Sequence, residues 1–152
     1  AAGAFPRLID LEVNPKIISS TVNLVLAQRL IRKLCKNCAK EIDPSETDKK
    51  IIDNILNSIT AETPTDLQKN KVWQAVGCEM CSGLGYKGRI GIYEAIKMTR
   101  EIEDIINKNP SENEIEKVAK SQGIMNLRED GIVKVLQGVT TLEELSRVID
   151  LS

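Results

Sequence analysis

The chain has 152 residues, of which 41% are hydrophobic and only 3% aromatic, and its 21 basic residues nearly balance its 22 acidic ones. This length supports one ordinary core, or a small core with a metal-stabilised satellite. A net charge of −1 and few aromatic side chains argue against nucleic-acid binding, and no apolar run of about 18 residues predicts a transmembrane helix. We expect a soluble, cytoplasmic protein with an aliphatic core.

The first part of the chain has helical periodicity. Apolar residues between positions 1 and 12 recur at the spacing of a short amphipathic helix. Asn14 and Pro15 predict the start of a second helix, because Asn is a good N-cap and Pro fits the first helical position. Its apolar stripe runs to about Ala27, and residues 26–34 fit either a continued helix or a strand.

Two Cys-x-x-Cys pairs contain every cysteine of the chain: Cys35 with Cys38, and Cys78 with Cys81. A two-residue spacer lets one tight turn direct two sulfurs at a single point, and two such pairs complete a tetrahedral zinc site. Because sulfur would fill all four positions, leaving none for water, the pattern predicts one structural zinc per chain. Iron stays open as an alternative metal.

Two other interpretations of the cysteines compete with zinc. Two disulfides require an oxidising compartment and usually a secretory leader, whereas no apolar leader precedes these residues and the start at Ala1 suggests a fragment. A redox Cys-x-x-Cys would leave the second pair unexplained. Basic side chains near the cysteines in sequence would offset the net charge of about −2 on a tetrathiolate zinc: Lys33, Lys36, Lys40, Lys87 and Arg89.

The segment between the pairs is predicted to hold a helix and a strand. Ser45 can cap a helix whose isoleucines recur on one side, residues 60–70 are a polar loop, and residues 71–76 alternate like a short strand. The metal would then fasten the two ends of this insertion together.

After the second pair, a glycine-rich loop leads into another strand. No lysine followed by Ser or Thr completes a phosphate-binding loop there. Residues 89–96 alternate, with Ile90, Ile92 and Ile96 on one face and Glu94 as the exception. Residues 26–34 are the expected antiparallel partner, which places the cysteine segment at the tip of a hairpin.

Four short helices are predicted in the remainder of the chain. Their start signals are Thr99, the capping box of Ser111 with Glu114, the apolar run 127–136, and Thr141. We expect them to form a small bundle with facing apolar stripes. The fold class is therefore α+β and mainly α: helices, a small antiparallel hairpin interrupted by a tetracysteine zinc insertion, and a C-terminal helical bundle.

Several segments together resemble the ATPases of type II secretion and type IV pilus assembly. They are Ala27-Gln-Arg-Leu-Ile-Arg-Lys-Leu-Cys35, Gly77-Cys-x-x-Cys81, Gly85-Tyr-Lys-Gly-Arg-Ile-Gly-Ile-Tyr-Glu94, Pro6–Asp10, Leu127–Gly131 and Gly138–Glu144. The resemblance implies a parent protein that forms a homo-hexamer, binds ATP with Mg, and drives pilin or pseudopilin assembly. Implied partners are an inner-membrane platform protein and cytoplasmic assembly proteins, with no nucleic acid, and the parent would lie in the cytoplasm, peripheral to the inner membrane.

The resemblance also implies a division of the chain. Residues 1–34 would be the distal part of the ATPase core, 35–88 the zinc insertion, 89–98 the returning strand and 99–152 the helical bundle. The Walker A, Walker B and histidine motifs of the family are absent, so we expect no catalytic or nucleotide-binding residue here and no ATP hydrolysis by this piece alone. Arg7, Gln28 and Arg29 could sense nucleotide across a subunit boundary, although surface or packing roles are the simpler interpretation.

A zinc-stabilised nucleic-acid-binding or protein-interaction module is the alternative function. A shift assay with DNA and RNA at low salt tests nucleic-acid binding. A third possibility is an extracytoplasmic disulfide module, which a count of free thiols tests. The sequence does not separate pilus assembly from protein secretion.

Overall fold

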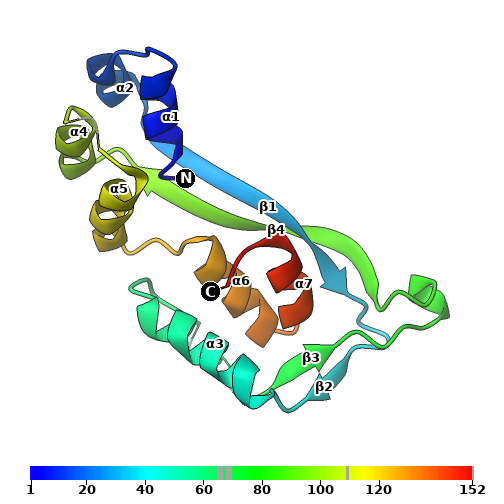
Figure 1. Cartoon of the computed structure of the whole chain (residues 1–152). Helices are drawn as coiled ribbons and strands as arrows, with labels where there is room; N and C mark the ends of the chain where they lie inside the picture. Colours follow the sequence, from blue (N-terminus) through cyan, green and yellow to red (C-terminus); the bar gives the residue numbers. More distant parts are fainter. Residues whose placement is uncertain (65–66, 68–69, 109, 152) are drawn as a thin grey trace.

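The computed structural model describes residues 1–64, 67, 70–108 and 110–151. A long antiparallel hairpin of strands β1 (Leu24–Leu34) and β4 (Tyr86–Lys97) runs through the molecule, with helices grouped along it (Figure 1). The expected α+β, mainly helical class is confirmed. The remaining elements, in chain order, are α1 (Ala4–Asp10), α2 (Pro15–Thr21), β2 (Lys40–Ile42), α3 (Glu46–Ser58), β3 (Val72–Gln74), the 3-10 turn η1 (Glu79–Cys81), α4 (Arg100–Ile106), α5 (Glu112–Ala119), the 3-10 turn η2 (Lys120–Gln122), α6 (Leu127–Leu136) and α7 (Leu142–Val148).

The pairing of β1 with β4 confirms the predicted hairpin. Val25 lies opposite Ile96 and Ile31 opposite Ile90, with a register shift between Arg32 and Leu34. The alternation expected in β4 is also confirmed, since Ile92 and Ile96 are buried. Residues 26–34, for which helix and strand were both open, are strand because their core face pairs with the isoleucines of β4.

The opposite face of the hairpin carries exposed apolar side chains. Leu24, Leu26 and Leu30 alternate along β1 and expose 49%, 54% and 53% of their surface, and Tyr93 of β4 exposes 44%. The register places Tyr93 opposite Gln28 on this face. In Figure 1, α6 and α7 lie along one side of the hairpin. The hairpin is therefore apolar on both faces, although the described helices cover only one of them.

The second helix is shorter than the sequence predicts. Asn14 caps α2 as expected, its side chain accepting a hydrogen bond from Lys16 N at 2.9 Å, but the helix ends at Thr21 and not near Ala27. Val22 is already extended. The prediction was wrong because the apolar spacing of 22–27 also suits a strand, and pairing with β4 decides between the two.

Local capping signals are confirmed in the later helices. Ser45 and Asp48 form a capping box that starts α3, and Ser111 and Glu114 form the one that starts α5. The predicted helix over 127–136 matches α6, which begins with a further capping box from Asn126. Such caps satisfy backbone N–H groups that lack intrahelical partners, which is why they predict helix starts from local sequence.

Two separate apolar clusters replace the single C-terminal bundle. The first joins α3, α6 and α7 to the hairpin through buried residues such as Ile52, Ile92 and Leu145. The second joins α4 and α5 to α1 and α2 at the far end of the hairpin, around Phe5 and Ile102. The four C-terminal helices therefore do not all face one another, because each pair packs on apolar side chains of different earlier elements.

The insertion contains one strand that the sequence did not predict. The predicted strand near 71–76 is β3, and it pairs antiparallel with β2, Trp73 lying opposite Glu41. The sequence of β2, Lys40-Glu41-Ile42, has no alternation of polar and apolar residues, unlike the run 71–76 that predicted β3. Of the predicted loop 60–70, residues 65, 66, 68 and 69 lie outside the described part of the chain.

Candidate metal centre

The four cysteines lie on two tight turns at the tip of the hairpin. Cys35 directly follows β1, and the N–H groups of Cys38 and Ala39 donate to its carbonyl at 3.2 and 2.9 Å. The second turn is similar: the N–H groups of Cys81 and Gly83 donate to the carbonyl of Cys78 at 3.1 and 2.9 Å. Each turn directs two thiols to one point.

A backbone hydrogen bond holds the two turns together. The N–H of Cys35 donates to the carbonyl of Gly85 at 2.9 Å. The turns are 43 residues apart in sequence, yet they meet where β1 ends and β4 begins.

The sulfurs have the spacing of a tetrahedral metal site. The Sγ atoms of Cys35 and Cys78 are 3.9 Å apart, those of Cys38 and Cys81 3.8 Å, and those of Cys78 and Cys81 3.7 Å. All four lie within 4.8 Å of one another. Bonds of about 2.3 Å to a tetrahedral zinc ion would place sulfurs about 3.8 Å apart. The donor set therefore fits zinc without rearrangement.

The disulfide alternative does not match the structure. A disulfide brings two sulfurs to about 2.05 Å, whereas all four cysteines are free thiols. The convergence of both pairs on one point also disfavours a redox Cys-x-x-Cys acting alone.

Backbone N–H groups favour the thiolate form of one ligand. Burial opposes the charge of Cys81, but the N–H groups of Cys78 and Gly85 donate to its Sγ atom, each at 3.2 Å. These donations outweigh burial and lower the pKa of the Cys81 thiol to about 6. Thiolate is the form that binds metal.

Glycine is required at one position of the second turn. Gly77 has a φ of +101°, and a Cβ atom there would lie 2.3 Å from the carbonyl oxygen of Gly83. No side chain fits in that space. Gly88 also has a positive φ, +81°, but open space surrounds it.

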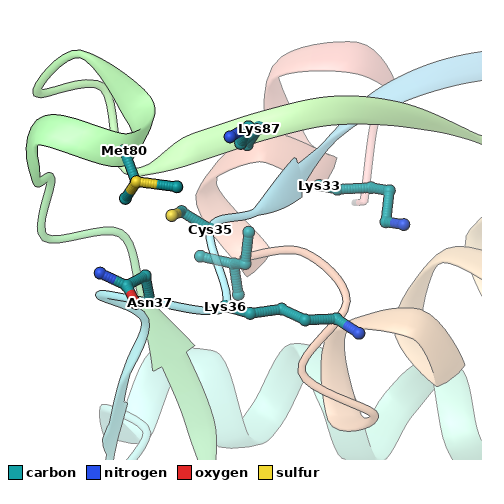
Figure 2. Close-up of a pocket in the computed structure, with 7 residues that line it drawn as sticks. Lys33, Cys35, Lys36, Asn37, Met80 and Lys87 are labelled. Atoms are coloured by element: carbon teal, nitrogen blue, oxygen red, sulfur yellow. The ribbon is translucent and has the colours of Figure 1, made fainter.

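Three of the five basic residues expected near the metal surround a single pocket. Lys33, Lys36 and Lys87 line it together with Cys35 (Figure 2). Lys40 in β2 and Arg89 in β4 are exposed and do not line this pocket. Arg7, Gln28 and Arg29 are exposed on α1 and β1, and their role stays a prediction.

Sequence reasoning missed a buried ionic cluster beside the cysteines. Glu144 in α7 is 1% exposed and accepts hydrogen bonds from Arg32: from the backbone N at 3.0 Å, Nε at 2.8 Å and Nη2 at 2.6 Å. Arg147 donates to the same carboxylate from Nε at 2.9 Å and Nη2 at 2.8 Å. Burial disfavours the carboxylate charge, but these donors outweigh burial and lower the pKa of Glu144 to about 2.

Further contacts join this cluster to the end of the hairpin. The Arg32 guanidinium lies 4.2 Å from the centre of the Tyr86 ring, and the Tyr86 hydroxyl is 2.7 Å from Thr141 Oγ1. Thr140 Oγ1 donates to the Arg32 carbonyl at 2.9 Å. Three segments that resembled the secretion ATPases therefore meet here. Arg32 and Glu144 are 112 residues apart, so no local sequence pattern predicts their contact. The one sequence feature they share is that both lie in segments that resemble the secretion ATPases.

The comparisons with known proteins agree with the family resemblance of the sequence motifs. A family model described as type II/IV secretion system protein matches residues 1–147. The chain belongs to this family.

Its relatives are secretion and pilus ATPases. The chain is 39% identical to the type IV pilus assembly ATPase PilB of Thermus thermophilus over 152 residues, covering 99% of this chain and 16% of the relative. It is 41% identical to PilB of Acinetobacter baylyi over 150 residues, covering 97% and 24%. It is 36% identical to the type II secretion system protein E of Aeromonas hydrophila over 148 residues, covering 97% and 27%.

The chain thus spans about a quarter or less of the length of these relatives. Among the helices of the described residues, none combines the length and apolar character that a membrane span requires.

Proposed function

We propose that this chain is the zinc-stabilised C-terminal region of a hexameric cytoplasmic ATPase that powers assembly of a type IV pilus or a type II secretion pseudopilus. The main support is twofold: three family-like segments meet beside the end of β1, and four sulfurs have tetrahedral spacing. Cys35, Cys38, Cys78 and Cys81 would hold one structural zinc ion. A filled set of four thiolates supplies fold stabilisation and no open position for a reacting water.

In this proposal, ATP and Mg bind to other parts of the parent protein. The relatives named as ATPases extend far beyond the matched region. Hydrolysis needs a phosphate-cradling backbone, a lysine and a magnesium carboxylate, and the 152 residues contain no motif that supplies these parts. We expect the purified chain to show no ATPase activity above background.

The exposed face of the hairpin supports the assignment of residues 1–34 to a larger core. Leu24, Leu26 and Leu30 form an apolar stripe on β1 beside Tyr93 of β4. A stripe of this kind on a sheet face is stabilised when another layer covers it. The remainder of the ATPase is the covering layer proposed here.

The mechanical role follows from the rigid connection between the cysteine site and α7. The zinc ion would fix the tip of the hairpin, and the Glu144 cluster ties the same tip to the C-terminal helix. A stiff unit of this kind would transmit movements of the ATPase ring to the inner-membrane platform protein, the parent remaining peripheral to the membrane.

Metal analysis of the purified chain tests the zinc assignment. We expect mass spectrometry to find one equivalent of zinc per chain in protein purified under reducing conditions. One equivalent of iron, or no metal in a folded chain, would contradict the assignment.

A chimera tests the assignment to pilus assembly. The matching region of the Acinetobacter baylyi PilB, which is 41% identical, would be replaced by this chain. We expect the chimera to assemble pili, and a chimera with all four cysteines changed to serine to lose them. A chimera that accumulates normally but assembles no pili would count against this function.

A further inference from the structure

A pocket of about 320 Å³ lies beside the cysteine site, outside the four metal ligands except for Cys35 (Figure 2). Three lysines from different segments line it: Lys33 at the end of β1, Lys36 in the first cysteine turn and Lys87 in β4. Leu34 and Met80 add apolar surface. In Figure 2, Lys33 and Lys36 extend to the same side, whereas Met80 lies on the other side with the Cys35 sulfur directed toward it.

The three ammonium groups form no ion pair within the described residues. Among the described residues, the carboxylate of Glu144 nearby is paired with Arg32 and Arg147, and Lys71 pairs with Glu41 at 3.2 Å. Arg89, two residues after Lys87 on β4, is likewise exposed and unpaired in the described chain. A tetrathiolate zinc would offset about two of these four positive charges. Lys33, Lys36, Lys87 and Arg89 therefore form a rim that keeps a net positive charge, although the whole chain has a net charge of −1.

Exposed apolar side chains adjoin this rim on the second cysteine turn. Met80 exposes 60% of its surface, Leu84 66% and Val76 58%. Large apolar side chains are disfavoured in water, and a flexible thioether such as that of Met80 adapts to varied partners. The one acidic side chain of this turn, Glu79, is exposed and does not line the pocket.

We propose that this surface docks an acidic segment of a partner protein in which carboxylates alternate with apolar side chains. The carboxylates would contact Lys33, Lys36 and Lys87, and an apolar side chain would cover Met80. The lining favours this partner over a phosphate ligand, since a phosphate ion has no apolar part to contact Leu34 and Met80. The proposal goes beyond the ATPase assignment and does not depend on it.

A direct binding experiment tests this docking surface. The probe is a short fluorescent peptide that alternates glutamate with leucine, titrated with the zinc-loaded chain at low salt and read by anisotropy. We expect saturable binding that weakens as salt rises, because exposed charges are screened. A peptide alternating lysine with leucine should not bind, and neither should one of glutamate and glycine.

Variants identify the surface that the peptide occupies. The triple variant Lys33→Glu, Lys36→Glu, Lys87→Glu should weaken binding at least about 10-fold, since each reversal replaces attraction by repulsion. The matched control Lys16→Glu, Lys50→Glu, Lys108→Glu reverses three exposed lysines elsewhere and should bind as the unchanged chain does. Met80→Ser, which leaves the charges intact, should also weaken binding.

Metal content separates loss of the docking surface from loss of the fold. Each variant should keep one equivalent of the metal, and Lys36→Glu alone serves if the triple variant does not fold. Equal binding by the triple variant and its control would overturn the proposal, as would equal binding of the acidic and basic peptides. Displacement of the peptide by millimolar inorganic phosphate at constant ionic strength would instead indicate a small-anion site and also overturn it.

Discussion

At the scale of single residues, Glu144 is a buried group whose charge stabilises the fold. Its carboxylate is 1% exposed and receives hydrogen bonds from two arginines on different elements. Removing a buried acceptor of charged hydrogen bonds typically costs about 1.5–3 kcal/mol. The carboxylate also lies beside the end of β1, so its loss affects the approach to Cys35.

We expect Glu144→Gln to lower the free energy of unfolding by about 2 kcal/mol at pH 7. The folded-state pKa of Glu144 is lowered from 4.5 to about 2. Because the folded state holds the carboxylate ionised, its contribution is full above pH 4.5 and is lost as the pH falls toward 2. Urea unfolding at a series of pH values should show the difference between the two proteins narrowing over that range.

Glu143→Gln is the matched control, since the neighbouring Glu143 is exposed. It should change stability by less than about 0.5 kcal/mol. A loss as large as that of Glu144→Gln, or a difference independent of pH, would show that the buried cluster is not the cause.

Cys81→Ser should weaken zinc binding by more than about 100-fold. Loss of groups that merely orient metal ligands already costs about 10–100-fold, and serine replaces a thiolate that receives two backbone hydrogen bonds. Competition with a chromophoric chelator measures the affinity. Ser82→Ala, at the exposed neighbouring position, is the control, and an unchanged affinity in Cys81→Ser would remove Cys81 from the metal site.

At the scale of elements, the second cysteine turn depends on a backbone conformation that only glycine allows. Gly77 and Gly88 both have positive φ, but only Gly77 lies against another backbone segment. An alanine at position 88 therefore adds backbone strain alone, whereas an alanine at position 77 adds the same strain and a steric clash.

Gly77→Ala should destabilise the chain more than Gly88→Ala and should lower zinc affinity. The backbone strain common to both is about 1–2 kcal/mol, while a Cβ atom at Gly77 would lie 2.3 Å from the Gly83 carbonyl oxygen. Thermal unfolding and chelator competition on both variants provide the measurement. Equal losses of stability and of zinc affinity in the two variants would mean that the chain relieves the clash with Gly83 without displacing the cysteines.

At the scale of the whole molecule, the insertion shares one core with α6 and α7. Ile52 and Ile55 of α3 belong to the same apolar cluster as Ile132 of α6 and Leu145 of α7. The insertion is therefore joined to the rest of the chain in two ways, through the proposed metal and through this core. The boundary at residues 35–88 stays a prediction.

Removal of zinc should loosen the insertion unevenly. Zinc binding contributes on the order of 10 kcal/mol to the folding of small sites, so amide protection should fall most in the cysteine turns. Ile52 and Ile55 of α3 and Val72 of β3 lie in the shared core, so α3 and β3 should retain more protection than the turns. Hydrogen exchange with and without chelator, under reducing conditions, measures this.

The hairpin provides an internal reference for the same experiment. Amides of β1 and β4 near the Val25 and Ile96 pair lie in the second apolar cluster or beside it and should be unaffected. Unchanged protection in the cysteine turns would contradict a structural metal, and a uniform loss over the chain would contradict two separate clusters.

What the sequence determined by itself are the features set by local chemistry. Capping residues such as Ser45 and Ser111 predicted helix starts, alternation predicted β4, and the spacing of the cysteines predicted the convergence of four sulfurs. These signals depend on residues a few positions apart, and nearby backbone groups respond to them in any tertiary setting.

Only the tertiary structure decided the features that depend on distant partners. The apolar spacing of residues 22–27 suits either element, and pairing with β4 made most of it strand. The C-terminal helices divided between two clusters because their apolar stripes pack against different earlier elements. Arg32 pairs with the buried Glu144 across 112 residues, since charge pairing depends on proximity in space and leaves no pattern along the chain.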